Sequence, residues 1–269
     1  MKVGYYQYRP VFGNIDHNLK KVVNKLAGVN ADLIVLPELA FTGYYFKDRK
    51  EVKTLAEDPY HSATVDTLKK LCREKKFHIV TGFTERAKDR LFNSALLIGP
   101  KGIKHIYRKI HLFNEESNWF DKGDIALQVN KVNNTRVGIM VCFDWAFPEV
   151  TRVLALHGAD IICHPSNLVL DYCQKTMLTR CLENKVYAIT TNRFGYDNRP
   201  HGKLRFTGRS QIVAPGGTLI HQARSQAEEL YIMDLDPVLA RDKSITPLNN
   251  VLSDRRPQFY SALVSLKGK

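Results

Sequence analysis

The sequence lacks a long apolar segment. None of its apolar runs approaches the ~20 residues that a membrane-spanning helix needs. The opening residues, MKVGYYQYRP, also lack the basic start and apolar centre of a secretory leader, and they look strand-like instead. We therefore expect a soluble, unexported protein that acts in the cytoplasm and does not bind membranes.

Cysteine is scarce and odd in number, which argues against a disulfide framework. A chain without a secretory leader is expected to keep its thiols reduced, and the spacing of these cysteines matches no zinc pattern. We therefore expect neither a metal nor a cofactor. The five cysteines are Cys72, Cys142, Cys163, Cys173 and Cys181.

A concentrated basic segment is also missing, although the net charge is +13. Lysine and arginine are spread along the whole chain. Pairs such as Lys20-Lys21 and Lys69-Lys70 fall at helical spacing, which is typical of a solvated helix face. A nucleic-acid-binding protein would need clustered basic residues with interleaved aromatic residues. We therefore predict no nucleic-acid partner.

Short apolar runs alternate with amphipathic stretches throughout the chain, which is typical of an α/β fold. No internal repeat, low-complexity segment or linker interrupts this pattern, so we predict a single domain over residues 1–269. Its last part, 237–269, is polar and shows no core pattern. Helices are predicted at 14–29, 62–75, 149–157 and 173–184, and strands at 2–8, 32–36, 77–83, 91–98, 102–107, 137–141, 160–164, 186–192 and 230–235, with a further hairpin around 215–217.

Three reactive side chains stand where predicted strands end. Glu38 follows one strand within LPEL, Lys109 follows another within YRKI, and Cys142 ends a third within IMVCF. A carboxylate in so apolar a setting needs a partner to offset its desolvation. Because active sites in open α/β sheets gather at the carboxyl ends of strands, we expect these three side chains to share one site.

The three side chains suit nucleophilic attack on a carbonyl carbon. A thiol of pKa ~8.5 is only a few per cent ionised at neutral pH. We expect the Lys109 ammonium, and the start of a helix near Phe147-Pro148, to favour the thiolate. Glu38 can take the thiol proton and pass it to a leaving amine. Lys109 and the backbone N–H of Phe143 can form an oxyanion hole.

Each residue alone also has a structural interpretation. Glu38 fits a helix cap or turn, Lys109 a surface lysine and Cys142 an inert buried cysteine. Three blocks in order carry more weight, and they closely resemble the signature blocks of the nitrilase superfamily of carbon–nitrogen hydrolases. A catalytically silent binding protein of this fold would commonly lack one of the three residues, and all three are present. The blocks are LPELAFTGY, YRKIHLF and CFDWAFPE, followed by HPSN at 164–167 and ENKVYAITTNRFG at 183–195.

The resemblance implies roles for individual residues. Glu38 would be the base, Lys109 the lysine and Cys142 the nucleophile of a Glu-Lys-Cys triad. A second catalytic glutamate would be Glu116 rather than Glu115. The implied fold is a four-layer αββα sandwich. It also implies a homodimer or higher homo-oligomer that pairs through the helices after Cys142 and at 173–184, with the 237–269 tail in subunit contacts.

The implied reaction is hydrolysis of a non-peptide carbon–nitrogen bond in a small linear amide. It proceeds through a cysteine thioester and releases ammonia or an amine. The order Cys-Phe-Asp-Trp looks more like the amide- and carbamoyl-cleaving branches than the true nitrilases. Trp145-Ala146 stands where carbamoyl-D-amino-acid hydrolases carry arginines. The alternatives are a nitrilase acting on small aliphatic nitriles and an N-carbamoyl amide hydrolase.

Several further residues complete the predicted site. We expect Asp144 and Glu149 to anchor the turn after Cys142 through backbone or arginine contacts. Arg193, Arg199 and His201 lie in a predicted loop, where they could select an anionic substrate. The substrate pocket is predicted to include Tyr44, Trp145 and Asn167, with Phe41, Tyr45, Trp119 and Tyr172 as further aromatic candidates.

Overall fold

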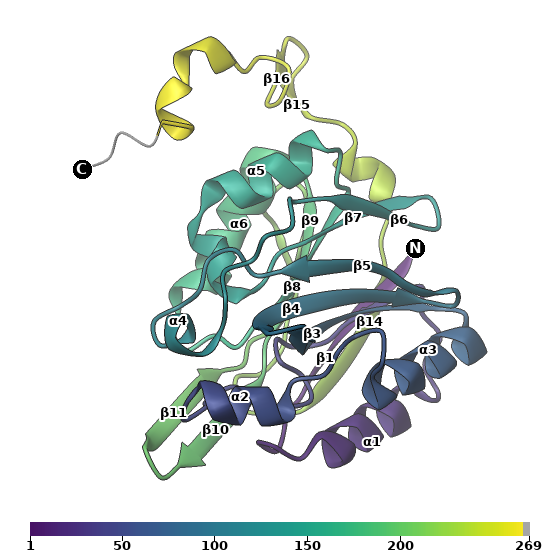
Figure 1. Cartoon of the computed structure of the whole chain (residues 1–269). Helices are drawn as coiled ribbons and strands as arrows, with labels where there is room; N and C mark the ends of the chain where they lie inside the picture. Colours follow the sequence, from purple (N-terminus) through teal and green to yellow (C-terminus); the bar gives the residue numbers. More distant parts are fainter. Residues whose placement is uncertain (266–269) are drawn as a thin grey trace.

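Two six-stranded mixed sheets pack face to face in the computed structural model, which describes residues 1–265 (Figure 1). In spatial order, the first sheet contains β14 (Glu229–Asp234), β1 (Lys2–Gln7), β2 (Leu33–Val35), β3 (His78–Ala87), β4 (Arg90–Gly99) and β5 (Gly102–Arg108). The second contains β13 (Leu219–Gln222), β12 (Gln211–Val213), β9 (Tyr187–Thr191), β8 (Ile161–Pro165), β7 (Thr135–Ile139) and β6 (Val129–Val132). In both sheets a parallel centre has antiparallel strands on its flanks.

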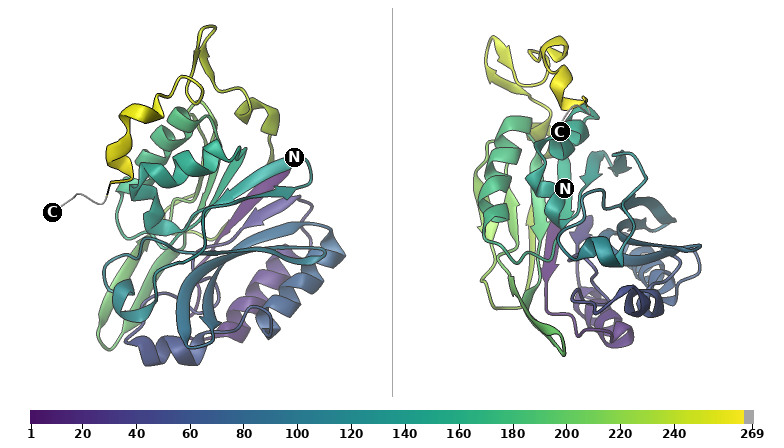
Figure 2. Two further views of the ribbon diagram at one scale, coloured as in Figure 1. Left: turned by 45° about the horizontal axis from the view of Figure 1, so that its top comes forward. Right: turned by 60° about the vertical axis from the view of Figure 1, so that its left-hand side comes forward.

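Helices cover the outer face of each sheet and complete four layers (Figure 2). The helices α1 (Ile15–Leu26) and α3 (Ala63–Lys75) pack on the first sheet, and α5 (Pro148–Leu156) and α6 (Tyr172–Asn184) pack on the second. The predicted αββα sandwich is confirmed. No helix among residues 1–265 combines the length and apolar character needed to cross a bilayer.

The strand β2 shows how the sequence pattern builds these layers. Successive side chains of a strand point to opposite faces. Leu33 and Val35 join the core between the sheets, whereas Ile34 and Leu36 join the core beneath α1 and α3. A strand buried on both faces reads as a continuous apolar run, which explains the segment Asp32-Leu33-Ile34-Val35-Leu36.

The helix starts follow local capping rules. The side chain of Asn14 accepts a hydrogen bond from the His17 N–H at the start of α1, and Ser62 does the same for Val65 at the start of α3. Sequence patterning missed α2 (Arg49–Leu55), α4 (Glu116–Trp119) and the hairpin of β10 (Phe194–Arg199) and β11 (Gly202–Thr207). These elements are short or polar, so they carry little periodic signal.

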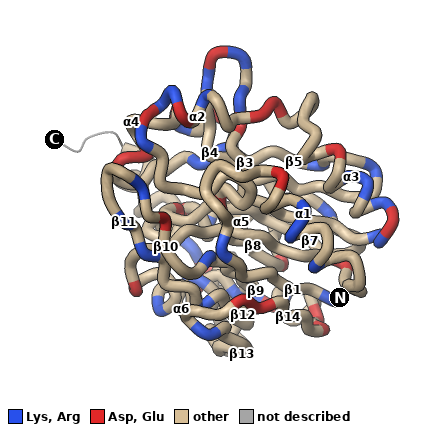
Figure 3. The backbone as a smooth tube through the Cα atoms, turned by 90° about the horizontal axis from the view of Figure 1, so that it is seen from below, with Lys and Arg blue, Asp and Glu red and all other residues tan. Residues whose placement is uncertain are grey.

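The C-terminal segment leaves the body of the molecule (Figure 1). Three of its apolar side chains are largely exposed: Leu248, Phe259 and Val264. The segment contains η2 (Pro237–Ala240), β15 (Ser244–Thr246), β16 (Asn249–Asn250), η3 (Pro257–Phe259) and η4 (Ser261–Leu263). In the view of Figure 3, lysine and arginine alternate with acidic residues over several elements and do not gather on one of them.

Candidate active site

Glu38, Lys109 and Glu116 form a buried ionic cluster. The Lys109 Nζ lies 2.7 Å from Glu38 Oε1 and 2.8 Å from Glu116 Oε1, and none of the three side chains is exposed to solvent. Cys142 lies close enough for all three charges to act on its thiol. The structure therefore brings together four side chains that the sequence separates by up to 104 residues (Glu38 to Cys142).

Glu38 is positioned by a tight backbone approach. It lies just beyond β2, and the next residue, Leu39, has a φ of +45°. Gly82 of β3 packs directly against this segment, since a Cβ there would lie 2.4 Å from the Glu38 Cα and 2.3 Å from the Leu39 N. Only glycine leaves room for this approach. Asn93 Nδ2 then donates to Glu38 Oε1 at 2.7 Å, which orients the carboxylate.

The backbone of Lys109 is held by hydrogen bonds to both its N–H and its carbonyl group. Its N–H donates to the Asn93 carbonyl at 2.8 Å, and its carbonyl accepts from the Gly123 N–H at 2.9 Å. Burial disfavours the ammonium form. The carboxylates of Glu116 and Glu38 outweigh that effect and raise the pKa of Lys109. The side chain is therefore a fixed positive charge between two carboxylates.

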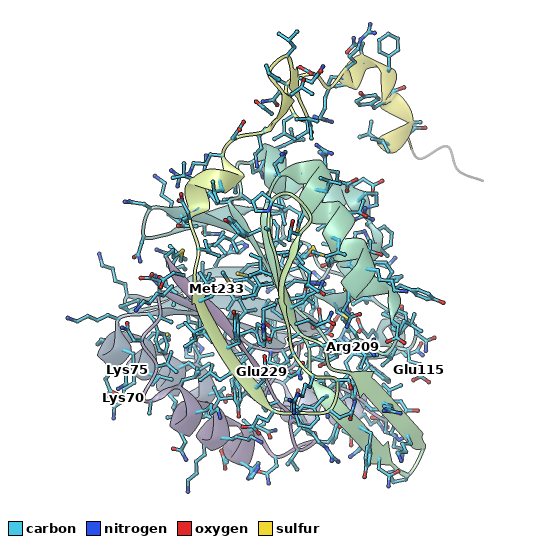
Figure 4. The ribbon with its side chains drawn as sticks, turned by 180° about the vertical axis from the view of Figure 1, so that it is seen from behind. Lys70, Lys75, Glu115, Arg209, Glu229 and Met233 are labelled. Atoms are coloured by element: carbon cyan, nitrogen blue, oxygen red, sulfur yellow. The ribbon has the colours of Figure 1, made fainter. Side chains whose placement is uncertain are left out.

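Glu116, rather than Glu115, contributes the second carboxylate. Its Oε1 accepts from the Tyr44 hydroxyl at 2.6 Å, and its Oε2 accepts from the Phe113 N–H at 3.2 Å. Burial raises the pKa of Glu116 against the opposing charge of Lys109. The neighbouring Glu115 is exposed and lies at the edge of the molecule (Figure 4).

Cys142 occupies a sharp turn at the end of the segment that follows β7. Its φ of +42° falls in the left-handed region, which non-glycine residues rarely adopt. His164 Nε2 contacts the Cys142 carbonyl at 2.9 Å and stabilises this turn. Burial lowers the pKa of His164 to about 4, so the ring is neutral and donates from Nε2.

Asp144 anchors the same turn through its side chain. Its Oδ2 accepts from the Val141 N–H at 2.8 Å and from the Tyr107 hydroxyl at 2.7 Å, and its Oδ1 contacts His111 Nδ1 at 2.8 Å. The predicted backbone contact of Asp144 is therefore confirmed at the Val141 N–H, and its side-chain partners are a tyrosine and a histidine rather than an arginine. The prediction for Glu149 was wrong, because its side chain is exposed on α5 and makes no polar contact within residues 1–265.

The Lys109 ammonium favours the Cys142 thiolate, as expected, but burial and the charge of Glu38 have larger effects. Burial, followed by the negative charge of Glu38, raises the pKa of the Cys142 thiol well above its usual value. Two carboxylates and one ammonium surround the sulfur, so a thiolate would add a second net negative charge to a dry site. The chain after Cys142 also enters a 3₁₀ turn, η1 (Cys142–Ala146), before α5 begins at Pro148. The resting group is the thiol, which needs a base at the moment of attack.

The thiol lines a cavity formed by segments that follow β5, β7 and β8. Trp145 and Asn167, both predicted pocket residues, line it together with residues that sequence reasoning missed. The complete lining is Phe113, Cys142, Phe143, Trp145, Asn167, Leu168, Val169 and Leu170. Phe113 ends the YRKIHLF block and 168–170 directly follow HPSN, so their sequence neighbours were the available signal.

A second cavity adjoins the first and shares Phe113 and Val169 with it. Tyr44 lies here, away from the thiol cavity, and the full lining is Tyr44, Tyr45, Phe113, Asn114, Glu115, Trp119, Val169 and Leu204. Two other aromatic candidates lie elsewhere, since Phe41 is in the core beneath α1 and α3 and Tyr172 is exposed on α6.

The arginines considered for anion binding are already paired. They lie at or in the β10–β11 hairpin, where a loop was predicted. Arg193 is buried against Asp197 at 2.8 Å, and Arg199 forms an ion pair with Glu51. His201 packs on the Tyr45 ring. Among residues 1–265, no group of three histidine, cysteine, aspartate or glutamate side chains is placed to hold a metal ion.

Comparison with known proteins decides the family. The carbon–nitrogen hydrolase family profile matches residues 2–243. The chain belongs to the carbon–nitrogen hydrolase family. A nitrilase of Pyrococcus abyssi is 40% identical over 263 residues, which cover 97% of this chain and 99% of that protein. An (R)-stereoselective amidase of a Pseudomonas species is 31% identical over a matched region that covers 95% of this chain and 92% of the amidase.

The fold comparison agrees with this assignment. The crystal structure of a carbon–nitrogen hydrolase from Helicobacter pylori G27 superposes with a TM-score of 0.89 at 24% identity, over 100% of this chain and 98% of that one. The present carbon–nitrogen hydrolase is therefore an enzyme of the nitrilase superfamily, as the sequence blocks predicted.

Proposed function

We propose that this carbon–nitrogen hydrolase cleaves a small linear amide through a thioester on Cys142. One observation carries the proposal. Glu38 accepts hydrogen bonds from Lys109 and Asn93 on Oε1, whereas its Oε2 is buried and has no hydrogen-bond partner. The charge of this carboxylate acts on the Cys142 thiol. A base with one oxygen held in place and the other free is what proton transfer from a thiol requires.

The acylation step follows from this geometry. The thiol proton moves to Glu38 Oε2 as the sulfur attacks the amide carbon and forms a C–S bond. The oxyanion is stabilised by the Lys109 ammonium and the backbone N–H of Phe143. When the intermediate collapses, the C–N bond breaks and Glu38 returns the proton to the departing nitrogen. The products are ammonia, or an amine, and the thioester.

Deacylation uses the same base. A water molecule gives a proton to Glu38 and attacks the thioester carbon, and the C–S bond breaks to restore the thiol and release the acid. Glu116 keeps the Lys109 ammonium aligned through both steps, since it accepts hydrogen bonds from Lys109 and Tyr44 on the same oxygen.

A small nitrile is the second candidate substrate, favoured by the 40% identity to a nitrilase. The amide is preferred because of the Cys-Phe-Asp-Trp turn and the amidase relative. An N-carbamoyl amide remains a third option within the same chemistry. We further infer that the enzyme acts in the cytoplasm, where the five free cysteines would stay reduced.

Ammonia release from a panel of short amides, nitriles and carbamoyl compounds tests the proposal. We expect turnover of amides, a mass increase of one acyl group on Cys142 under trapping conditions, and a loss of at least ~1000-fold in kcat/KM for Cys142→Ala. Cys163→Ala is the matched control, because that cysteine is buried in β8 and should leave turnover intact. Ammonia release that survives the Cys142→Ala change would refute the mechanism.

We also propose that two copies of the chain pair through α5, α6 and the 237–269 tail. Leu156 on α5 and Leu182 on α6 are exposed apolar side chains, and the tail carries Leu263. After leaving the body of the molecule, the tail borders these helices at one place, where Arg255, Tyr260 and Leu263 share a cavity with α5 and α6 residues. Exposed apolar side chains on neighbouring elements support an interface at this place.

Light scattering tests the pairing. The wild-type particle should have at least twice the 30.8-kDa chain mass, and Leu156→Asp combined with Leu182→Asp should lower it toward one chain. Tyr60→Asp alters an even more exposed side chain just before α3 and should leave the mass unchanged. A monomeric wild-type protein would contradict the proposal.

A further inference from the structure

Asn167 carries a buried acceptor with no partner beside the nucleophile. The residue is 2% exposed and lines the cavity above Cys142, yet its Oδ1 makes no hydrogen bond. A buried carbonyl oxygen that lacks a donor is destabilising, and native proteins keep few of them. Such an atom at the wall of a reaction cavity indicates that a ligand supplies the donor.

The rest of Asn167 is firmly held, so Oδ1 cannot easily turn elsewhere. Its Nδ2 donates to the Glu38 carbonyl at 2.9 Å. The flanking residues are fixed as well, since the Leu168 N–H donates to Asn192 Oδ1 at 2.8 Å. Turning the amide to satisfy Oδ1 would break the bond to the Glu38 carbonyl.

We propose that Asn167 Oδ1 accepts a hydrogen bond from the N–H of the scissile amide and so selects N–H-bearing substrates over nitriles. This inference rests on the proposed function. Two further unpartnered acceptors belong to this region, Glu38 Oε2 and Asn93 Oδ1. The first is needed for the thiol proton, and Asn93 does not line the thiol cavity. Asn167 is then the acceptor left for the substrate nitrogen.

The proposed contact also orients the leaving group. While Asn167 holds one N–H, the nitrogen lone pair that forms as the C–N bond weakens can face Glu38. Glu38 then delivers the proton it took from the thiol, and ammonia departs. A nitrile nitrogen has no hydrogen, so its binding leaves Oδ1 unpaired. A site built to bind a hydrogen of the substrate discriminates against an analogue that lacks it.

A pair of substrates with the same acyl group tests this role. Butyramide and p-nitrophenyl butyrate would both acylate Cys142, but only butyramide has an N–H at the scissile atom. We expect Asn167→Ala to lower kcat/KM for butyramide by about 10- to 100-fold and to change that for the ester by less than about 3-fold.

Asn93→Ala provides the matched control. Asn93 donates to Glu38 Oε1 and does not line the thiol cavity. Its loss should therefore lower kcat/KM for both substrates by a similar factor. If Asn167→Ala does not fold, Asn167→Ser is measured in the same way, because its side chain is shorter and removes the amide oxygen, leaving only a hydroxyl nearer the backbone.

The outcomes separate the two proposals. An equal loss on both substrates in the Asn167 variant would show that Asn167 acts only by supporting Glu38, and an unchanged butyramide rate would show that the contact does not form. Either result overturns the inference while the proposed function stands. A wild-type enzyme that cleaves the ester and no amide would overturn both.

Discussion

Two buried ionic groups lie side by side in this molecule and have opposite characters. Arg193 and Asp197 form a closed pair: Asp197 Oδ1 accepts from Arg193 at 2.8 Å, and Oδ2 accepts from Arg193 at 3.0 Å and from the backbone N–H groups of Tyr44 and Tyr45. The guanidinium also stacks on the Phe206 ring at 4.1 Å. Both carboxylate oxygens are satisfied, and the pair is closed in this sense, although the Arg193 Nε–H has no hydrogen-bond partner.

The cluster of Glu38, Lys109 and Glu116 is equally buried but remains open. One oxygen of Glu38 has no partner, and the cluster acts on a thiol that lines a cavity. Buried charge alone therefore does not mark a reaction site. An unfilled acceptor, a nucleophile and a cavity in the same place do.

Tyr44 connects the two groups. Its hydroxyl donates to Glu116 in the open cluster, and its backbone N–H donates to Asp197 in the closed pair. The closed pair thus has a structural effect on the site, because it fixes the backbone of a residue that orients the second glutamate. The comparison can be tested by opening the closed pair and by disabling the open cluster.

Opening the closed pair should have the largest effect on folding. Asp197→Ala leaves the Arg193 guanidinium buried without a carboxylate, and we expect a loss of about 3–5 kcal/mol in the free energy of unfolding, measured with urea. Asp66→Ala removes an exposed carboxylate 3.1 Å from Lys69 and should change the free energy of unfolding by less than ~1 kcal/mol. Equal effects of the two substitutions would show that the buried pair is not a special feature.

Disabling the open cluster should lower catalysis, and it should also lower stability because two buried carboxylates lose their cation. Lys109→Met removes the ammonium that stabilises both the oxyanion and the charge on sulfur, so kcat/KM for amides should fall by about 100- to 1000-fold. Alkylation of Cys142, followed by mass spectrometry, should slow in the same variant. In the wild type Cys142 should react fastest, because the other four cysteines are completely buried. Equal reactivity of all five would contradict the assignment.

The smallest predicted effect concerns the neutral histidine beneath the nucleophile. The pKa of His164 is about 4 in the fold against an ordinary 6.5, so the folded chain binds fewer protons than the unfolded chain between these values. The neutral His164 therefore contributes up to about 3 kcal/mol to the free energy of unfolding above pH 6.5, and this contribution is lost as the pH falls toward 4. His164→Gln keeps an N–H donor but cannot titrate. Urea unfolding at pH 6.5 and 4.5 should show a smaller loss for this variant, and an equal loss would exclude His164 as the cause.

Local pattern was sufficient for much of the fold. The strands 32–36 and 160–164 and the helix 62–75 each lie within a few residues of the observed element, because apolar periodicity and a capping serine act over short distances. The placement of reactive residues just after strands was likewise visible in the sequence. The hairpin β10–β11 was not, because it is polar and is positioned by distant partners such as Glu51.

Some features of the site had no local signal. The Lys109 ammonium favours the thiolate as expected, but burial and two carboxylates from distant segments outweigh it. The turn before α5 is a 3₁₀ turn. Glu149 was expected at the site because it lies close to Cys142 in sequence, but the helix directs it to solvent. Sequence distance and spatial distance differ most at such turns.

By itself, the sequence determined which residue types the chemistry uses and that each follows a strand, since both depend on neighbours along the chain. Only the tertiary structure decided which oxygen of Glu38 is free, that Asn167 faces the thiol cavity with an unpaired oxygen, and that Tyr44 joins the two ionic groups. These properties depend on contacts such as Asn167 with Glu38, 129 residues apart, and Tyr44 with Glu116, 72 residues apart. A hydrogen bond is satisfied or left open by atoms within about 3 Å, whatever their separation along the chain.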